Sequence, residues 1–355
     1  MKKTATVKDV ANLAGVAPST VSFVLNRTIG QTISETTKAK VLEAATALNY
    51  RPESTSVLMR RRSSRTIGLV APESDDLRFN EMSAGVMSAA EEEGFGVLMC
   101  SSKREMGEIS YISAYHECRI DGVVLVAPDR GNNLVENEHI HNLLDAGIPF
   151  ATVCSRSEIP NIHQVNINFY QCGMDAGTHL FKSGCRKVIC ISPLDGRHSH
   201  ASASESERLR GFSDAARMWG CEPRIKYLPR SFESQELGSA KAFLASAAFD
   251  IGVDGYAATW AACCVWLIAA SKDMGLRLDK SKVISMEKSK CLQLAYPDMP
   301  YMTQPFYDVA KSAAKNLVQN CFNSEDRRNW PAASEIIACR LVDETRVAAA
   351  SDKIS

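Results

Sequence analysis

Two patterns in this sequence hold side chains that are able to do enzyme chemistry. Ser312 and Lys315 have the SxxK spacing of serines that attack acyl groups, but the SDN and KTG partner motifs of such enzymes are absent. The two histidine pairs, His139 with His141 and His198 with His200, could in principle bind a metal. Neither pair has cysteine or carboxylate partners at ligand spacing, so we expect solvated histidines and no metal.

Other cofactor signals are also missing from the sequence. Neither phosphate-loop pattern, GxGxxG or GxxxxGK[ST], occurs. The 12 cysteines form no CxxC pair, which favours reduced, mostly buried thiols over disulfides or a metal centre. These observations predict a protein without a cofactor and make an enzyme the less favoured class.

A third chemical pattern is a short polar face within residues 6–26, TVKDVANLAGVAPSTVSFVLN. Thr6 and Asp9 have the spacing of a helix cap, and Gly15 supplies the positive φ that a tight turn needs. Pro18 suits the first position of a second helix, because its missing N–H would have no partner there. The sequence therefore predicts two short helices joined by a glycine turn.

The two expected helices have different faces. The apolar side should consist of Val10 and Leu13 in the first helix and Val21, Val24 and Leu25 in the second. The other face of the second helix is short and polar, as a helix that enters the major groove of DNA needs to be. An ordinary helical hairpin in a globular core is the alternative. The groove-facing positions are Ser19, Thr20, Ser22, Phe23 and Asn26.

Charge favours the DNA-binding interpretation. Residues 1–66 contain 11 Lys and Arg against 4 Asp and Glu, a net charge of +7, which leaves −7 on the rest of a neutral chain. A basic N-terminal segment can neutralise the phosphates of DNA, while the rest of the chain is acidic. The sequence contains no apolar run of about 18 residues that would cross a membrane, and it begins MKKTATVKDV, so we expect a cytoplasmic protein.

The remaining chain predicts one more helix and then an α/β body. Ser34 is a good cap for a third helix whose buried face holds Val41, Ala45 and Leu48. From Thr66 onward, apolar runs that read as buried parallel strands alternate with helical patterns, which is typical of a doubly wound fold. The expected strands are residues 66–71, 97–100, 122–127, 148–154, 187–192 and 282–286, with a further strand near 251–256 and strand-like residues at 336–342.

The segments TVKDVANLAGVAPSTVSFVLN, ISETTKAKVLEAATALNYRP and TIGLVAP together resemble the lactose and galactose repressor (LacI/GalR) family of bacterial transcription regulators. The resemblance extends from about residue 6 to residue 342. It implies an α N-terminal helix-turn-helix DNA-binding domain plus an α/β two-lobed periplasmic-binding-protein-like effector domain. The expected limits are residues 1–50 for the first domain, 51–65 for a hinge and 66–345 for the effector domain, with interlobe crossings near residues 155, 287 and 304.

The resemblance also implies how the protein would bind DNA. In the family, the hinge becomes helical on DNA and inserts an apolar side chain into the minor groove. The matching positions are Ser56 and Met59, where the family usually has Ala and Leu. Phe23 replaces a residue that many members use to read guanine, so an apolar contact is expected there. Thr6, Pro18 and Ser19 complete the predicted DNA-binding set with the groove-facing positions above.

A small effector is expected between the lobes, at the carboxyl ends of the strands. The resemblance implies three effector contacts by position. Arg208 matches an arginine that binds the effector, Ser204 matches a residue that makes a polar contact, and Glu287 matches an aspartate that binds ligand hydroxyls. Convergent arginines would favour an anionic ligand over a sugar, with surface ion pairs as the alternative for Arg78 and Arg156. The remaining expected contact is Phe79.

Two departures from the family affect this pocket. The family's Asn-Asp pair after the strand near residues 251–256 is expected at Ala257-Ala258, and its Asp-Asn pair at Asn168-Phe169. The pocket would then lack polar groups that bind a sugar. Three alternatives stay open: an inducer lowers DNA affinity, a corepressor raises it, or the pocket is degenerate and the protein binds DNA constitutively. The residues after 342 are too few for a tetramer-forming coiled coil, so a homodimer on a pseudo-palindromic operator is expected.

Overall fold

The computed structural model describes residues 6–25, 33–48, 63–71, 77–100, 110–126, 133–155, 157–194, 202–229, 252–275, 278–323 and 333–343. The chain divides into two compact units, Met1–Ser64 and Arg65–Ser355. Asn26, Ser56, Met59 and Arg156 fall outside the described residues, as does most of the expected hinge. The two units are described separately.

The first unit is a helical domain built from α1 (Val7–Ala14), α2 (Pro18–Leu25) and α3 (Glu35–Ala47). The predicted turn is confirmed, since Gly15 caps α1 with a φ of 66°. Ser34 caps α3 by accepting a hydrogen bond from the backbone N–H of Thr37. Local capping signals therefore set the limits of these helices.

A small core holds the three helices together. Its fully buried members include Val10, Val21 and Val41, whereas Val24 and Leu25 are partly buried at its edge. The expectation for Leu13 is wrong: its side chain is 57% exposed, and Ala11 and Ala14 are buried in its place. At about 3.6 residues per turn, positions 10, 11 and 14 share one face of α1, and position 13 lies beyond the edge of that face.

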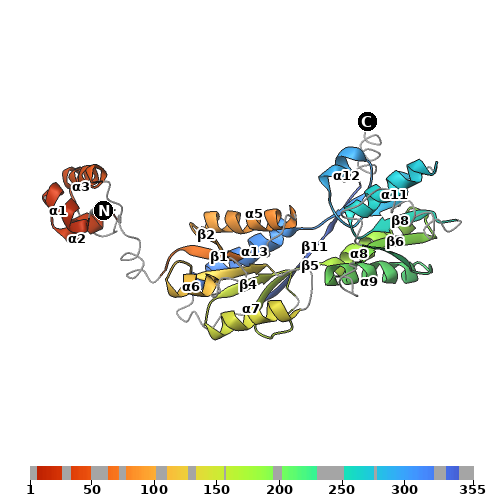
Figure 1. Cartoon of the computed structure of the whole chain (residues 1–355), viewed down its shortest axis with the longest axis horizontal. Coiled ribbons are helices and arrows are strands. Elements are labelled where there is room, and N and C mark those ends of the chain that lie inside the picture. Colours follow the sequence, from red (N-terminus) through yellow and green to blue (C-terminus); the bar gives the residue numbers. More distant parts are fainter. Residues whose placement is uncertain are drawn as a thin grey trace. The chain divides into compact units, whose positions relative to one another are not determined.

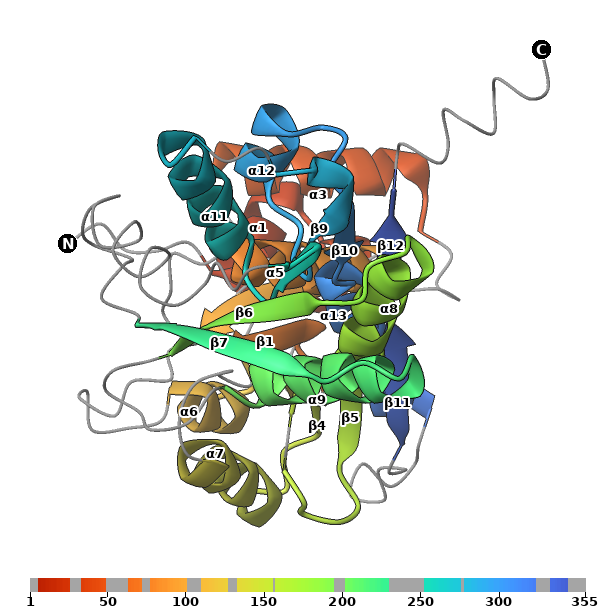
Figure 2. The same cartoon turned by 90° about the vertical axis from the view of Figure 1, so that its right-hand side faces the viewer.

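The second unit consists of two lobes, each with one six-stranded sheet between helices (Figures 1 and 2). In lobe 1 the strand order is β11-β5-β4-β3-β1-β2, and all of its pairings are parallel. The elements of lobe 1 are β1 (Thr66–Val70), α5 (Leu77–Glu92), β2 (Gly96–Cys100), α6 (Ser110–His116), β3 (Gly122–Val126), α7 (Asn133–Asp145), β4 (Phe150–Val153), β5 (His163–Asn168), α13 (Phe306–Asn323) and β11 (Ser334–Ala338).

Lobe 2 repeats this plan with the strand order β12-β10-β9-β8-β6-β7, in which β12 runs antiparallel to β10. A short 3₁₀ turn, Lys280–Lys282, precedes β9. The elements of lobe 2 are α8 (Phe169–Lys182), β6 (Val188–Leu194), α9 (Ala203–Met218), β7 (Arg224–Pro229), β8 (Gly255–Ala258), α11 (Ala261–Asp273), β9 (Val283–Ser285), α12 (Lys290–Ala295), β10 (Tyr301–Thr303) and β12 (Arg340–Val342).

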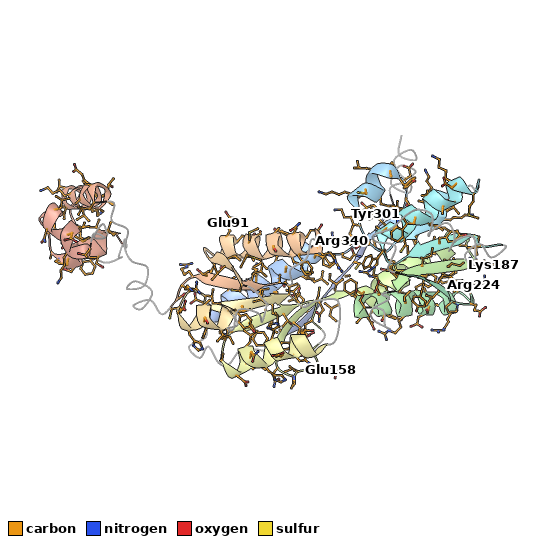
Figure 3. All side chains as sticks on the ribbon, in the orientation of Figure 1. Glu91, Glu158, Lys187, Arg224, Tyr301 and Arg340 are labelled. Atoms are coloured by element: carbon orange, nitrogen blue, oxygen red, sulfur yellow. The ribbon has the colours of Figure 1, made fainter. Side chains whose placement is uncertain are left out.

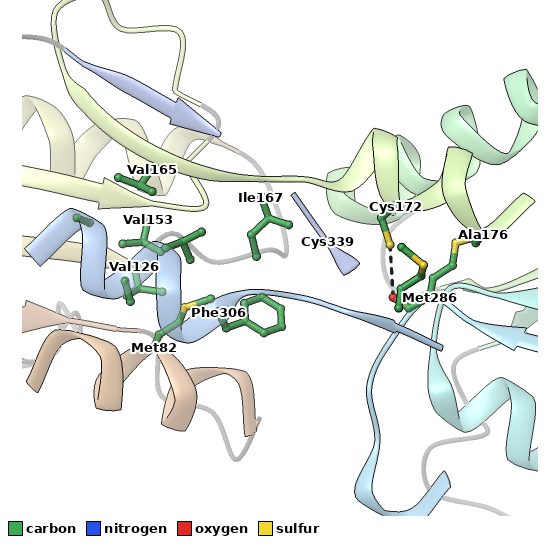
Figure 4. Close-up of a cluster of buried hydrophobic side chains, with 14 of the residues drawn as sticks. Met82, Val126, Val153, Val165, Ile167, Cys172, Ala176, Met286, Phe306 and Cys339 are labelled. Atoms are coloured by element: carbon green, nitrogen blue, oxygen red, sulfur yellow. Dashed lines mark hydrogen bonds between the residues drawn. The ribbon is translucent and has the colours of Figure 1, made fainter. Parts of the chain in front are cut away.

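Alternate residues of each strand enter different cores, because strand side chains point to opposite faces. In β3, Val124 and Val126 pack with α5 and α13, whereas Val123 and Leu125 pack with α6 and α7. The α5–α13 core of lobe 1 continues into the α8–α9 core of lobe 2 as one buried cluster, part of which Figure 4 shows. The two lobes therefore share a core where they meet.

The chain passes between the lobes at three places. It leaves β5 and enters α8 at residues 168–169, returns from β10 to α13 at residues 304–305, and crosses again at Cys339, between β11 and β12. The expected crossing near 304 is confirmed, whereas those near 155 and 287 are wrong. Residue 155 lies between two strands of lobe 1, and residue 287 lies between β9 and α12 of lobe 2.

The fold turns the carboxyl ends of both sheets toward the space between the lobes. Figure 3 shows Lys187 and Arg224, at the amino ends of β6 and β7, on the side of lobe 2 away from lobe 1. Arg340 lies at the interlobe crossing in the same view. Loops that follow the strands are thus placed to line a ligand site, as in other open α/β sheets.

Candidate functional site

The second helix of the helical domain presents the predicted DNA-binding face. Pro18 and Ser19 are exposed, whereas Thr20, Ser22 and Phe23 are partly buried. Residues in the first turn of such a helix are the ones that reach base edges in helix-turn-helix domains. The surface that α2 offers is therefore small and polar near its start, with one aromatic ring further along.

The start of α1 is fixed by a reciprocal cap. The backbone N–H of Thr6 donates to Asp9 Oδ2 at 2.7 Å, and the N–H of Asp9 donates to Thr6 Oγ1 at 3.4 Å. The backbone N–H groups of Thr6 and Asp9, which have no partner of their own at the start of a helix, are both hydrogen-bonded in this way. The cap sets the position at which the chain enters the domain.

Loss of this cap should weaken the helical domain measurably. We expect Thr6→Ala to lower its unfolding free energy by about 1 kcal/mol, because Thr6 Oγ1 then no longer accepts from the backbone. Urea unfolding followed by far-ultraviolet circular dichroism would measure the change. Thr46→Ala is the matched control, since its hydroxyl donates to Leu42 O on an exposed helix surface and makes no other hydrogen bond to the described residues. Equal losses in both variants would contradict the role of the cap.

A cavity of about 400 Å³ lies between the lobes. Arg78 and Phe79 from α5, Ser204 from α9 and Phe306 from α13 are on its wall. Two polar side chains at the carboxyl ends of lobe 1 strands also line this cavity: Ser155, after β4, and Asn168, at the end of β5. The described residues that line it are Arg78, Phe79, Met82, Cys154, Ser155, Asn166, Ile167, Asn168, Phe169, Tyr170, Ala203, Ser204, Glu207, Arg210, Phe306 and Ile336.

A second cavity of about 590 Å³ shares Arg78 and Phe306 with the first. Glu287, Lys288 and Lys290 of lobe 2 line it. The carboxylate of Glu287 accepts a hydrogen bond from the N–H of Ala261 at 3.1 Å, at the start of α11. The positive end of the α11 dipole favours a negative charge at this position.

Arg208 has a different place from the one expected. It is only 2% exposed and, among the described residues, it lines neither cavity. Its Nη1 donates to Thr259 O at 2.9 Å, and its guanidinium lies 4.7 Å from the centre of the Phe169 ring. Phe169 does line the first cavity, so the aromatic ring at the cavity wall also contacts the buried cation.

The expected position of Ala257-Ala258 is wrong. Both residues lie within β8 and are buried, at 0% and 1% exposure, on opposite faces of the sheet. The residues that follow the strand are Thr259 and Trp260. Thr259 is polar and buried, and its hydroxyl donates to Ser192 Oγ at 3.0 Å. The two alanines therefore remove no polar group from the wall of either cavity.

Sequence reasoning missed several lining residues. Phe306 begins α13 directly after an interlobe crossing, a place where cleft residues are common, and that position was the available signal. Tyr170 and Arg210 had no signal, because their pairing joins α8 to α9: the Arg210 guanidinium lies 4.6 Å from the Tyr170 ring. Arg210 also forms an exposed ion pair with Glu207 at 2.5 Å, which is worth little in water.

The histidines also differ in part from expectation. His139 is not solvated: it is partly buried, its Nδ1 lies 2.9 Å from the Tyr111 hydroxyl, and burial lowers its pKa. His141 is exposed, and His198 and His200 fall outside the described residues. Within the described ranges no group of His, Cys, Asp and Glu is placed to hold a metal ion, and no helix is long and apolar enough to cross a membrane.

Comparison with known proteins identifies both units. Residues 6–53 match the sequence family described as bacterial regulatory proteins, lacI family, and residues 64–247 match the periplasmic binding proteins and sugar binding domain of LacI family. The chain belongs to the lacI family. It is a DNA-binding transcriptional regulator with a small-molecule effector domain, which confirms the expected family, fold class and general function.

Individual relatives of this lacI-family regulator span nearly its whole length. The HTH-type transcriptional repressor PurR of Vibrio cholerae is 28% identical over 94% of this chain and 96% of its own, and PurR of Vibrio vulnificus is 27% identical over 94% and 97%. The lac repressor dimer bound to operator and the anti-inducer ONPF has the same fold, with a TM-score of 0.75, 18% identity, and coverage of 96% of this chain and 98% of that chain.

Proposed function

We propose that this lacI-family regulator is a cytoplasmic, homodimeric repressor, and that an anionic metabolite in the interlobe cleft sets its operator affinity. The named PurR relatives support repression. The observation that carries the ligand class is the position of Arg78, which lines both cavities beside Phe306. A guanidinium shared by two adjoining cavities can bind a carboxylate or phosphate with two parallel hydrogen bonds.

Buried Arg208 supports the same ligand class. Its Nε makes no hydrogen bond within the described residues, and its two partners given above are a carbonyl and a ring face, neither of which carries a full negative charge. A buried cation whose partners among the described residues are neutral is costly, and an anionic ligand in the first cavity, which Phe169 lines, would offset part of that cost without contacting Arg208. Asn166, Asn168 and Ser204 supply neutral polar groups at the same wall.

The test compares neutral and anionic metabolites of the same skeleton, such as a sugar and its phosphate, by thermal shift. We expect the anionic member alone to raise the melting temperature. DNA binding measured against salt, with and without that compound, then shows whether it acts as an inducer or a corepressor. A melting temperature and DNA affinity that no metabolite alters would contradict control by an effector and favour constitutive binding.

The residue that carries this proposal can be tested directly. We expect Arg78→Gln to weaken binding of the anionic compound about 10- to 100-fold, since a hydrogen bond to a charged group contributes roughly 1.5–3 kcal/mol. Arg217→Gln is the matched control: its side chain is 65% exposed and bonds to Asp214, outside both cavities. Isothermal titration calorimetry would measure both, and an unchanged affinity in Arg78→Gln would refute the assigned role.

A further inference from the structure

Arg65 is the first residue of the second unit, and its backbone is tied to lobe 1 on both sides. The boundary between the two units falls between Ser64 and Arg65. The backbone N–H of Arg65 donates to Asp121 Oδ2 at 2.7 Å, and its carbonyl oxygen accepts from the N–H of Gly96 at 2.8 Å. These bonds join the residue to the start of β2 and to the residue before β3, the two strands that flank β1.

The side chain of Arg65 adds a link to helix α5. Its Nη2 donates to the carbonyl oxygen of Glu93 at 3.0 Å, directly after the last residue of α5. Its guanidinium lies 5.5 Å from the centre of the Phe95 ring. A cation at the carboxyl end of a helix also interacts favourably with the helix dipole. The exposed Arg65 is therefore held by contacts of its backbone and of its side chain at the same time.

The backbone of Arg65 has a conformation that costs free energy. Its φ is 50°, in the left-handed region that residues other than glycine, asparagine and aspartate rarely adopt. Such conformations persist where the surrounding contacts enforce them, and they are concentrated at functional sites. Folding alone would favour glycine here, because glycine adopts this φ without strain. The arginine side chain thus points to a role beyond stability.

The helix that Arg65 contacts at its carboxyl end begins at the interlobe cavities. Arg78, in the first turn of α5, lines both cavities, and Phe79 lines the first. Helix α5 has 16 residues and is therefore about 24 Å long. Figure 3 shows Glu91, near its carboxyl end, on the side of lobe 1 away from lobe 2. One helix thus extends from the cleft to the residue at which the second unit begins.

Helix α5 is fixed against α13, which comes from lobe 2. A Cβ on Gly85 of α5 would lie 2.3 Å from Tyr307 O of α13, so the backbones of the two helices are in close contact. Gln319 of α13 donates to Glu93 Oε1 at 3.4 Å, and the carbonyl oxygen of the same Glu93 accepts from Arg65. Since α13 starts at an interlobe crossing, a displacement at the cleft would move both helices as one body.

We propose that Arg65 is a positioning residue that couples the interlobe cleft to DNA binding, with α5 as the rigid connection. A change around Arg78 displaces α5 and, through Glu93 and Phe95, the point at which the chain leaves lobe 1. The inference rests on the proposed function for the nature of the signal, an anion in the cleft. Coupling between two sites is reciprocal, so DNA bound by the helical domain should in turn alter α5.

This reciprocity allows a test without an effector. Amide hydrogen exchange of the full-length protein is measured by mass spectrometry, with and without a saturating duplex that the protein has selected from a random library. In the wild type we expect DNA to slow exchange in α5 about fivefold, the lower end of typical coupling between sites. In Arg65→Asn the duplex should still bind, but the slowing in α5 should be lost.

The choice of variants separates coupling from folding. Asparagine tolerates the φ of position 65 and keeps both backbone bonds, whereas its side chain is too short to reach Glu93 O. Arg65→Gly, which also removes the backbone strain, should behave in the same way. Arg119→Asn is the matched control, because it removes the same charge from lobe 1 and its ion pair with Glu117 is exposed. It should show the same slowing in α5 as the wild type.

Two results of the exchange experiment would overturn the inference. One is an absence of any effect of DNA on α5 in the wild type. The other is an equal slowing in the wild type, Arg65→Asn and Arg65→Gly, which would mean that DNA shields α5 directly and that Arg65 transmits nothing.

A separate measurement distinguishes failure of this inference from failure of the proposed function. Where an anionic compound changes the DNA affinity of the wild type, the ratio of the DNA dissociation constants with and without it should approach unity in Arg65→Asn. The affinity of the cleft for the compound should stay as in the wild type. A full ratio in Arg65→Asn overturns the role of Arg65 alone. If no compound changes DNA affinity in the wild type, the proposed function fails, and the exchange experiment still decides whether Arg65 couples DNA to α5.

Discussion

Replacing Gly211 with alanine is expected to lower the unfolding free energy of lobe 2 by about 3 kcal/mol, the upper part of the usual cost of overpacking. A Cβ at this position would lie 2.0 Å from Tyr170 O and 2.8 Å from the backbone nitrogen of Met174. These are backbone atoms of α8, so no side-chain rotation relieves the contact. Helices α8 and α9 would have to separate around fully buried Phe212.

The same close approach exists in the reverse direction. A Cβ on Gly173 of α8 would lie 1.9 Å from Arg208 O of α9. The two glycines therefore allow the helix pair that positions Phe169 and Ser204 on the wall of the first cavity and Arg208 against the Phe169 ring. Gly211→Ala should weaken effector binding as well as stability, because each of these three side chains is placed by that pair.

Urea unfolding followed by far-ultraviolet circular dichroism would measure the effect, because this signal reports on lobe 2 and also on lobe 1, where the control position lies. Gly96→Ala is the matched control. Its new Cβ would lie no closer than 3.6 Å to a neighbouring heavy atom, the Thr66 hydroxyl oxygen, and its φ is not in the left-handed region. A loss in Gly211→Ala no larger than the loss in Gly96→Ala would contradict the close helix packing.

Val41→Asp is expected to abolish DNA binding while the effector domain stays folded. Val41 is fully buried in the core of the helical domain, together with Val10, Ala11, Ala14, Val21, Ala44 and Ala45. A core this small has little stability in reserve, and an unpaired buried carboxylate costs several kcal/mol. The three helices should therefore unfold, and α2 would no longer present its face.

Leu42→Asp is the matched control, because the adjacent side chain is 53% exposed. Both variants add the same negative charge, so their general electrostatic effect on DNA binding is alike. Fluorescence anisotropy with random-sequence duplex DNA at low salt avoids the need for an operator. We expect at least a 100-fold loss of affinity for Val41→Asp and a loss below 10-fold for Leu42→Asp; similar losses in both would show that charge, not folding, is responsible.

Features controlled by neighbouring residues were predictable from the sequence. The Thr6–Asp9 cap, the Gly15 turn and the Ser34 cap each depend on residues within one helical turn, and all three are confirmed. Long apolar runs likewise predicted β1, β3 and β4. The family resemblance predicted the two-lobed body, which periodicity alone indicated only in part.

Features that depend on how the chain returns through the fold were less predictable. Two of three expected interlobe crossings were wrong, because α13 and β11 come back to lobe 1 after lobe 2 has been formed. The strand β8 ends at Ala258, two residues later than expected, so Ala257 and Ala258 lie in the core and not at the cleft. Arg208 has the expected neighbours in sequence, but Phe169 covers it from another helix. The homodimer and the individual site residues remain predictions.

The position of β11 and β12 has a consequence for synthesis on the ribosome. They are the last two strands of the part of the chain that the structure describes, and they lie at the sheet edges next to β5 and β10, one in each sheet. The outer edge of β5 in lobe 1 stays unpaired until residue 338 has emerged, and that of β10 in lobe 2 until residue 342 has emerged; lobe 1 also lacks α13 until residue 323 has emerged. Unpaired edges invite pairing with other chains. A nascent chain of this regulator therefore depends on residues 334–342 to cover the exposed edges of β5 and β10 in both lobes.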